Sequence, residues 1–81
     1  MEFDFQDKSV LVTGSTRGIG RATAEAFGRV GARVAINSRD EAEVAKAVGG
    51  RTRFFPAFGD VTIPESAQRI VEETLGAFGR L

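Results

Sequence analysis

The sequence contains no histidine, tyrosine, tryptophan or cysteine. The lack of cysteine excludes disulfides and thiolate metal sites. Because histidine and tyrosine are also missing, most of the usual general bases and nucleophiles are absent. The acidic residues show no metal-ligand spacing. We therefore expect neither a metal site nor catalysis by these 81 residues alone.

Long apolar runs and an excess of one charge are absent too. No apolar run approaches the roughly 20 residues that cross a membrane, and the acidic start, Met1–Phe5, lacks the basic region and apolar core of a secretory signal. Eleven basic residues balance eleven acidic ones, so the chain as a whole has no attraction to nucleic acid or anionic membranes. These features predict a cytoplasmic protein without a nucleic-acid or membrane partner.

A glycine-rich stretch, Thr13–Gly20, follows the apolar run Val10–Val12 and precedes a stretch with helical periodicity. In that order of strand, turn and helix, backbone N–H groups and the helix dipole favour an anion, which predicts a pyrophosphate seat rather than an ordinary loop. The spacing is G-x-x-x-G-x-G, not the G-x-G-x-x-G of many dinucleotide folds. By analogy with those folds, Gly14 lets the chain leave the strand, Gly18 lets the pyrophosphate approach, and Gly20 lets the helix pack closely on the strands.

The rest of the chain continues this alternation. Strands are predicted over 9–13, 34–36 and 52–58, and helices over 19–30, 41–48 and 64–78. The βαβαβα pattern predicts an α/β fold with a parallel three-stranded sheet and helices on both faces. Pro56 cannot donate to a ladder, so the third strand is expected at an edge, as in the order 3-2-1 of half a Rossmann fold.

Side-chain patterns predict the burial and the ends of these elements. The first strand is apolar on successive residues, as a strand buried on both faces should be. Asp40 and Thr62 are expected to start the second and third helices, each followed three residues later by the glutamate of a capping box. Gly31, Gly49 and Gly79 are expected to end the three helices.

Helical spacing also predicts which side chains face the core. In the first helix these are Ile19, Ala22, Ala26, Phe27 and Val30, and in the third Ala67, Ile70, Val71, Leu75 and Phe78. The glutamates on the helices are expected on solvated faces: Glu41, Glu43, Glu65, Glu72 and Glu73.

Polar or glycine-rich loops follow all three strands, at residues 14–20, 37–40 and 59–62. The carboxyl ends of parallel strands meet at one edge of a sheet, where such folds bind ligands. We therefore expect the three loops to converge on one rim.

Thr13–Gly20 resembles the cofactor signature of the short-chain dehydrogenase/reductase family. Segments 31–34, 37–39, 60–62 and 78–81 extend the likeness over nearly the whole chain and are most similar to the 3-oxoacyl-acyl-carrier-protein reductase branch. The resemblance implies that the turn holds a dinucleotide cofactor. The residues implied there are Gly14, Ser15, Thr16, Arg17, Gly18, Ile19 and Gly20.

The other two loops complete the implied cofactor site. Asp60 would accept from the exocyclic amine of adenine and the backbone of Val61 would line the ring, unless Asp60 only stabilises a turn or a helix start. Ser38 stands where NAD-binding relatives carry an acidic residue for the ribose, and Arg39 follows it. Together with Arg17, Arg39 can neutralise a ribose 2′-phosphate. We therefore predict NADP(H), the alternative being that both arginines are ordinary solvated residues.

Other parts of the family pattern have no counterpart here. The family continues with a fourth strand, an Asn-Asn-Ala-Gly segment, a catalytic Ser and a Tyr-x-x-x-Lys pair, whereas Lys8 and Lys46 lie in no such motif. By one hypothesis, residues 1–81 are the N-terminal cofactor-binding unit of an NADPH-dependent carbonyl reductase, such as one for 3-oxoacyl thioesters, truncated before its catalytic part. By the other, they form a stand-alone nucleotide-binding or protein-interaction module without catalysis.

Half a Rossmann fold without a fourth strand leaves its first strand at an open sheet edge. Such an edge is a template for pairing with another strand. We therefore expect self-association, or binding of a complementary fragment, through residues 9–13.

Overall fold

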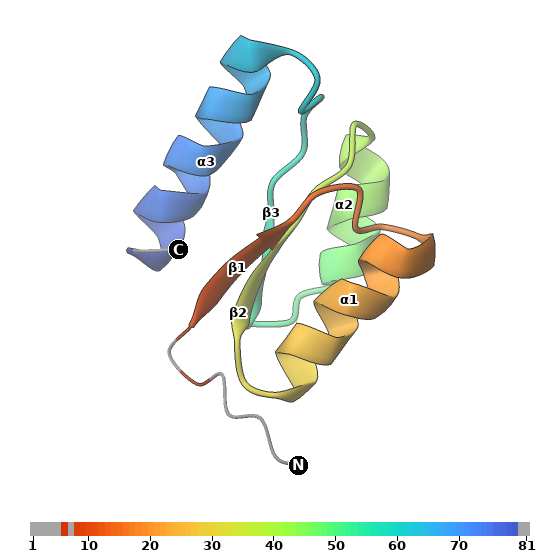
Figure 1. Ribbon diagram of the computed structural model, residues 1–81. Coiled ribbons are helices and arrows are strands. Elements are labelled where there is room, and N and C mark those ends of the chain that lie inside the picture. The colour runs from red at the N-terminus through yellow and green to blue at the C-terminus, as the bar shows by residue number, and fades with distance from the viewer. Residues whose placement is uncertain (1–5, 7, 80–81) are drawn as a thin grey trace.

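The computed structural model describes residue 6 and residues 8–79 (Figure 1). The acidic start and the last two residues of the 78–81 segment lie outside this part. The elements follow one another as β1 (Ser9–Val12), α1 (Gly18–Arg29), β2 (Arg33–Ile36), α2 (Glu41–Val48), β3 (Phe54–Pro56) and α3 (Pro64–Phe78). The predicted βαβαβα order is confirmed, although β1 and β3 are shorter than expected.

The three strands form one parallel sheet in the order β1-β2-β3. In its register, Val12 lies opposite Ile36, and Ile36 lies opposite Pro56. The central position of β2 and the edge position of β3 are those that the sequence predicted. Pro56 is tolerated because an edge strand needs ladder hydrogen bonds on one side only.

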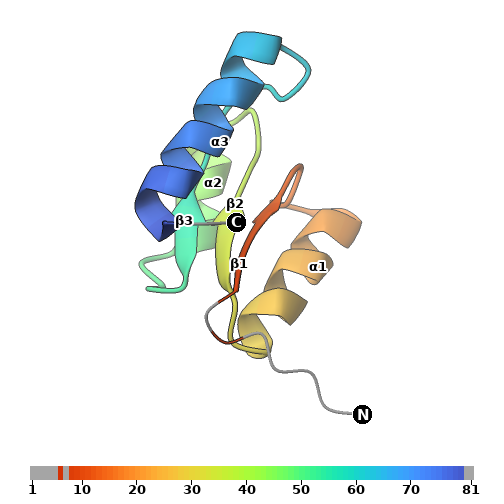
Figure 2. The same ribbon diagram turned by 60° about the vertical axis from the view of Figure 1, so that its left-hand side comes forward.

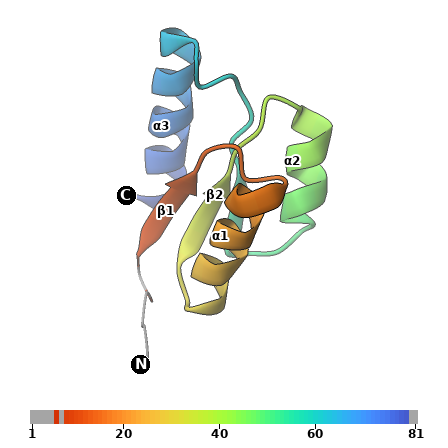
Figure 3. The same cartoon turned by 45° about the vertical axis from the view of Figure 1, so that its right-hand side comes forward.

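The helices cover both faces of the sheet, with α1 and α2 on one face and α3 on the other (Figures 2 and 3). Each face has its own core, because successive strand residues point to opposite sides. The α1/α2 core contains Ala24, Ala32, Val34, Ile36 and Val44. The α3 core is smaller and contains Ala35, Ala57 and Ile70.

The first strand is less buried than its apolar sequence predicts. Residues 34–36 of β2 are fully buried, whereas Val10, Leu11 and Val12 of β1 are only half-buried. β1 has a neighbouring strand on one side only, so its second edge is not covered by the sheet.

The face that α1 turns to the sheet combines small residues with Phe27, which is half-buried against the α1/α2 core as predicted. Ala24 is completely buried, and a Cβ on Gly28 would lie 2.6 Å from Cζ of Phe54. At this close approach larger side chains do not fit beneath the helix. Three residues expected in the core are instead exposed: Ile19, Ala22 and Ala26.

The third helix covers its face of the sheet with a narrower stripe than predicted. Ile70 and Thr74 are buried and Phe78 is half-buried, but Val71 and Leu75 are exposed. The apolar residues of α3 therefore extend beyond the surface that the described sheet can cover.

The helix ends match the sequence signals in part. Asp40 caps α2, its Oδ1 accepting from the amides of Ala42 (2.9 Å) and Glu43 (3.2 Å). Helix α3 begins at Pro64 with Ile63 at its N-cap, so the expectation that Thr62 caps it is wrong.

Within the described residues, no helix is long and apolar enough to cross a membrane.

The predicted C-terminal glycines are all found at the helix ends. Gly49 and Gly79 are the C-cap residues of α2 and α3, and Gly31 follows the C-cap of α1. All three have positive φ, for example +56° at Gly49, a conformation that glycine adopts without the clash of a Cβ.

Candidate functional site

The loops after β1, β2 and β3 leave the same end of the sheet (Figures 1 and 3). Together they line one pocket with a volume of about 510 Å³. The lining residues are Gly14, Thr16, Arg17, Asn37, Ser38, Arg39, Gly59, Asp60, Val61 and Thr62. The three loops therefore meet at one rim, as the sequence predicted.

Asn37, the residue directly after β2, joins the three loops. Its side-chain Oδ1 accepts from the Gly14 amide at 3.1 Å, and its Nδ2 donates to the carbonyl oxygens of Ala57 (2.8 Å) and Gly59 (3.2 Å). An amide side chain has both donors and an acceptor, so one buried group can satisfy neighbours of both kinds.

The backbone of Asn37 adds a second connection to the turn after β1. The Ser15 amide donates to the Asn37 carbonyl at 2.7 Å, and the Asn37 amide donates to Ser15 Oγ at 2.8 Å. Both residues are buried. Sequence reasoning placed Asn37 in the loop but gave it no role; the available signal was a lone amide side chain at the end of the central apolar strand.

The glycines of the turn serve distinct geometric needs. Gly14 and Gly18 have φ of +57° and +62°, where a side chain would be strained. A Cβ on Gly20 would collide with the carbonyl oxygen of Gly14. Gly20 therefore brings α1 against the turn, whereas the sequence analysis expected the close approach to be against the strands.

The start of α1 has backbone donors suited to an anion. Arg17 is its N-cap, and the Arg17 side chain makes no capping hydrogen bond. The first amides of a helix have no partner within the helix, so an uncapped N-terminus can donate them to a bound anion. The neighbouring side chain of Ile19 is 87% exposed.

Seven of the eleven site residues predicted from the sequence line the pocket. The four that do not line it lie in the turn or at the helix start: Ser15, Gly18, Ile19 and Gly20. Of these, Ser15 is completely buried and supports the turn from within.

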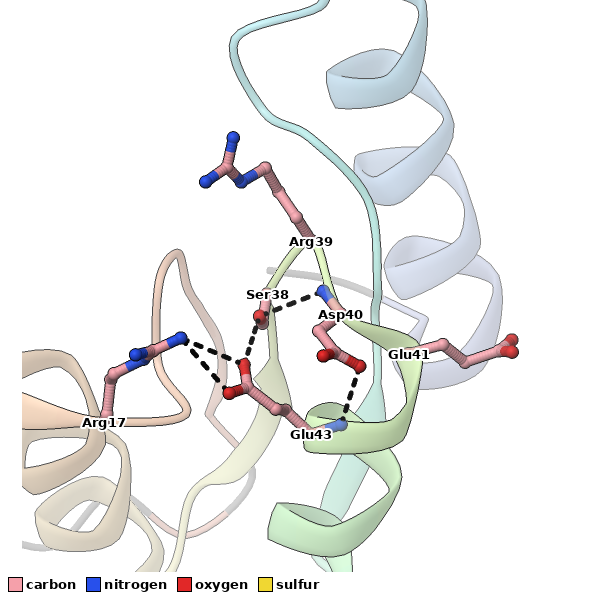
Figure 4. A pocket seen from close by; sticks show the side chains of 6 residues that line it. All are labelled: Arg17, Ser38, Arg39, Asp40, Glu41 and Glu43. Carbon is pink, nitrogen blue, oxygen red and sulfur yellow. Dashed lines mark hydrogen bonds and ion pairs between the residues drawn. The ribbon is translucent and has the colours of Figure 1, made fainter.

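The corner after β2 forms an adjoining pocket that contains a carboxylate. Glu43 Oε1 lies 3.2 Å from Arg17 Nη2, and Glu43 Oε2 accepts from the Ser38 hydroxyl at 3.2 Å (Figure 4). The same Oε2 also accepts from the Thr16 hydroxyl at 3.4 Å. Glu43 lies on a helix face that is partly open to water, as predicted, but its carboxylate is held by these three side chains. Its carboxylate faces the cofactor corner predicted from Ser38 and Arg39.

The capping of α2 explains why Glu43 is available to the corner. In a complete capping box its carboxylate would accept from the Asp40 amide. Here Ser38 Oγ accepts from that amide at 3.2 Å. Asp40 therefore caps the helix as predicted, but the reciprocal bond from Glu43 is replaced.

Arg39 and Glu41 also line this corner, and both extend away from the Glu43 carboxylate (Figure 4).

In the third loop, Asp60 Oδ1 accepts from the amide (2.9 Å) and hydroxyl (2.6 Å) of Thr62. The Thr62 hydroxyl most of all, with its amide and a lesser contribution from Arg39, lowers the pKa of the Asp60 carboxyl. Asp60 thus stabilises a turn, which was one of its two predicted roles.

Metal-ligating side chains do not cluster in the part of the chain that the structure describes. No group of three or more acidic, histidine or cysteine side chains there could hold a metal ion. The polar groups that line the two pockets are instead amides, hydroxyls, guanidinium groups and the carboxylates of Asp40, Glu41, Glu43 and Asp60.

Residues 8–81 match the family model described as short chain dehydrogenase. An uncharacterized oxidoreductase of Thermotoga maritima is 42% identical over 84 residues, covering 96% of this chain and 32% of the relative. The 3-ketoacyl-(acyl-carrier-protein) reductase from Brucella melitensis, complexed with NADH, has a TM-score of 0.91 at 28% identity, covering 96% and 32% of the two chains.

A second solved structure is similar to the same extent. The L-sorbose reductase from Gluconobacter frateurii, complexed with NADPH and L-sorbose, has a TM-score of 0.90 at 30% identity. The match covers 98% of this chain and 32% of the reductase, so the chain spans about a third of the length of these proteins. With nearly all its residues matched by the family model and its strands, helices and loops arranged as in these structures, the chain belongs to the short-chain dehydrogenase family.

Proposed function

We propose that this chain is the NADP(H)-binding part of an NADPH-dependent carbonyl reductase, acting on a carbonyl such as that of a 3-oxoacyl thioester. The observation that carries the proposal is the meeting of Arg17 and Arg39, from two different loops, in one pocket with Asp60 and Val61. Ser38 occupies the position at which a carboxylate would repel a ribose 2′-phosphate.

The described residues offer donors for two groups of a dinucleotide, the pyrophosphate and a ribose 2′-phosphate. The uncapped start of α1, approached through Gly14 and Gly18, would hold the pyrophosphate. The two guanidinium groups would bind a 2′-phosphate through charge-assisted hydrogen bonds. Bound NADPH would supply hydride to the carbonyl, while the family's proton donor, a tyrosine, is absent from residues 1–81.

The choice of NADPH rests on the chain's own residues. Of the two similar solved structures, one is complexed with NADH and the other with NADPH. We accordingly propose a preference for the 2′-phosphate, and a 3-oxoacyl substrate class on the resemblance of segments 31–34 and 60–62. The cytoplasmic setting remains a prediction from composition.

Calorimetric titration of the native protein that carries this chain tests the cofactor. NADPH is expected to bind about tenfold or more tightly than NADH, as expected for one or two added charge-assisted hydrogen bonds. Arg39→Ala should remove most of this difference. Arg53→Ala is the control, because Arg53 donates to the Gly31 carbonyl at the opposite end of the sheet. This variant should leave the difference in affinity between NADPH and NADH unchanged. Equal binding of both cofactors by the unmodified protein would contradict the proposal.

A second candidate, a nucleotide-binding module that acts through association, is favoured by the half-buried β1 edge and by exposed Val71 and Leu75. We propose that the β1 edge pairs with a second copy or with a complementary chain segment. Sedimentation over a concentration series should then show association, and Leu11→Pro should weaken it by removing a backbone donor. A monodisperse monomer at all concentrations would exclude pairing between copies.

A further inference from the structure

The Glu43 carboxylate, in the corner after β2, occupies groups that the cofactor phosphate would need. Glu43 accepts from Ser38 and is ion-paired with Arg17. Arg17 is one of the two guanidinium groups that the proposed function assigns to the ribose 2′-phosphate, and Ser38 occupies the position beside that phosphate. The donors come from different loops, so the carboxylate occupies the point where those loops meet (Figure 4).

The position of Glu43 is fixed by its helix, whereas the side chain of its partner Arg17 is largely exposed to water. The Glu43 amide is held by the Asp40 cap at 3.2 Å, and the Glu43 side chain is 37% exposed. The Arg17 side chain is 82% exposed, and an ion pair this accessible to water is weak. Arg17 can therefore exchange the carboxylate for another anion at little cost.

Two anions cannot share these donors without repulsion, because like charges at contact distance oppose each other even in water. A 2′-phosphate must therefore displace or approach the Glu43 carboxylate. A 2′-hydroxyl, in contrast, can donate a hydrogen bond to it. The corner thus contains one group that favours the hydroxyl, Glu43, and one that favours the phosphate and lies outside the cluster, Arg39.

We propose that Glu43 is a specificity-determining residue, whose carboxylate takes the place of a phosphate on Arg17 and Ser38 and reduces the preference for a 2′-phosphorylated ribose. This inference rests on the proposed function, since it requires the adenosine ribose to bind at this corner. It differs from the proposed function in predicting that removal of an acidic side chain increases the selectivity for NADP(H).

Glu43→Gln tests the inference, because glutamine keeps an oxygen acceptor for Ser38 and Thr16 and loses only the charge. We would titrate 2′,5′-ADP and 5′-ADP into the native protein and into the variant by calorimetry. The ratio of their affinities is expected to shift about tenfold towards 2′,5′-ADP in the variant. The shift should shrink when salt is raised, as a charge effect at an exposed site does.

Glu41→Gln is the matched control, because Glu41 lines the same pocket but points away from Arg17 (Figure 4). It should change the ratio by much less than Glu43→Gln. An unchanged ratio in Glu43→Gln, or an equal shift in both variants, would overturn this inference while leaving the proposed function intact. Failure of both nucleotides to bind the unmodified protein would overturn the two proposals together.

Discussion

Two parts of the same rim are built in opposite ways. The floor, formed by Asn37 and Ser15 with their partners Gly14, Ala57 and Gly59, is largely buried and has hydrogen bonds as short as 2.7 Å. The corner, formed by Arg17, Ser38 and Glu43, is open to water and its contacts lie between 3.2 and 3.5 Å.

This difference indicates that the floor positions the three loops, whereas the corner selects between ligands. A buried polar group that loses its partner costs its full desolvation penalty, so the floor holds the three loops in one arrangement. Exposed ion pairs contribute only about 0 to 1 kcal/mol, so the corner can exchange partners without disturbing the fold. We therefore expect substitutions in the floor to change stability, and substitutions in the corner to change ligand preference.

The largest expected effect is that of Asn37→Ala, which removes the partner of three backbone groups in the floor. The free energy of unfolding should fall by about 2 to 4 kcal/mol, since each buried polar group left unpaired costs about 1 to 3 kcal/mol and water can reach some of them. Urea unfolding of the native protein and the variant measures the difference.

Ser38→Ala is the matched substitution in the corner. It removes a half-buried hydroxyl that contacts Asp40 and Glu43, and it should lower the free energy of unfolding by less than about 1 kcal/mol. If Ser38→Ala proved as destabilising as Asn37→Ala, the distinction between floor and corner would fail.

A smaller effect is expected for Gly20→Ala, which brings a Cβ against the Gly14 carbonyl oxygen. The turn or the helix must shift, at a cost of about 1 to 3 kcal/mol. Gly76 is the control, because a Cβ there meets no atom within 4 Å of the described structure. Gly76→Ala should stabilise the protein by about 0.5 to 1 kcal/mol through the helix preference for alanine. Thermal and urea unfolding of both variants decide whether close packing, rather than glycine itself, matters at position 20.

The smallest effect is expected at the third loop, where Asp60 is held by Thr62. The pKa of Asp60 is lower in the folded protein than its ordinary value. Asp60 therefore contributes stability above the ordinary aspartate pKa of about 3.9, and this contribution is lost as the pH falls through the lower, folded-state value.

Asp60→Asn keeps an oxygen acceptor for Thr62 and cannot titrate. Between about pH 5 and pH 2 the unmodified protein should lose slightly more stability than this variant, as measured by unfolding at a series of pH values. An NMR titration of the Asp60 carboxyl carbon should place its midpoint below the usual aspartate value. A midpoint at or above that value would show that the Thr62 hydrogen bonds do not persist in solution.

The sequence was sufficient wherever a feature depends on neighbours along the chain. The alternation of apolar runs with helical periods predicted all six elements, and Pro56 predicted the edge position of β3. The glycines at the helix ends and the cap at Asp40 follow from backbone geometry within one turn. Parallel strand order then required the three loops to share one rim.

These local signals could not predict which side chains become partners across the sheet. Glu43 lies 26 positions from Arg17 in the sequence, and Asn37 lies 23 positions from Gly14. Periodicity placed Glu43 on a helix but could not foresee that Ser38 would take its capping bond and release its carboxylate to the corner. Likewise, apolar spacing put both Ile19 and Phe27 in the core, whereas only Phe27 packs there and Ile19 is exposed at the start of α1.

The amino-acid sequence by itself determined the order of the elements, the ends of the helices and the meeting of three polar loops, because local backbone preferences and the alternation of apolar residues act over a few positions. Only the tertiary structure decided which carboxylate reaches the arginine and which amide ties the loops together. These outcomes depend on distances between side chains that become neighbours only when the sheet and its helices have packed.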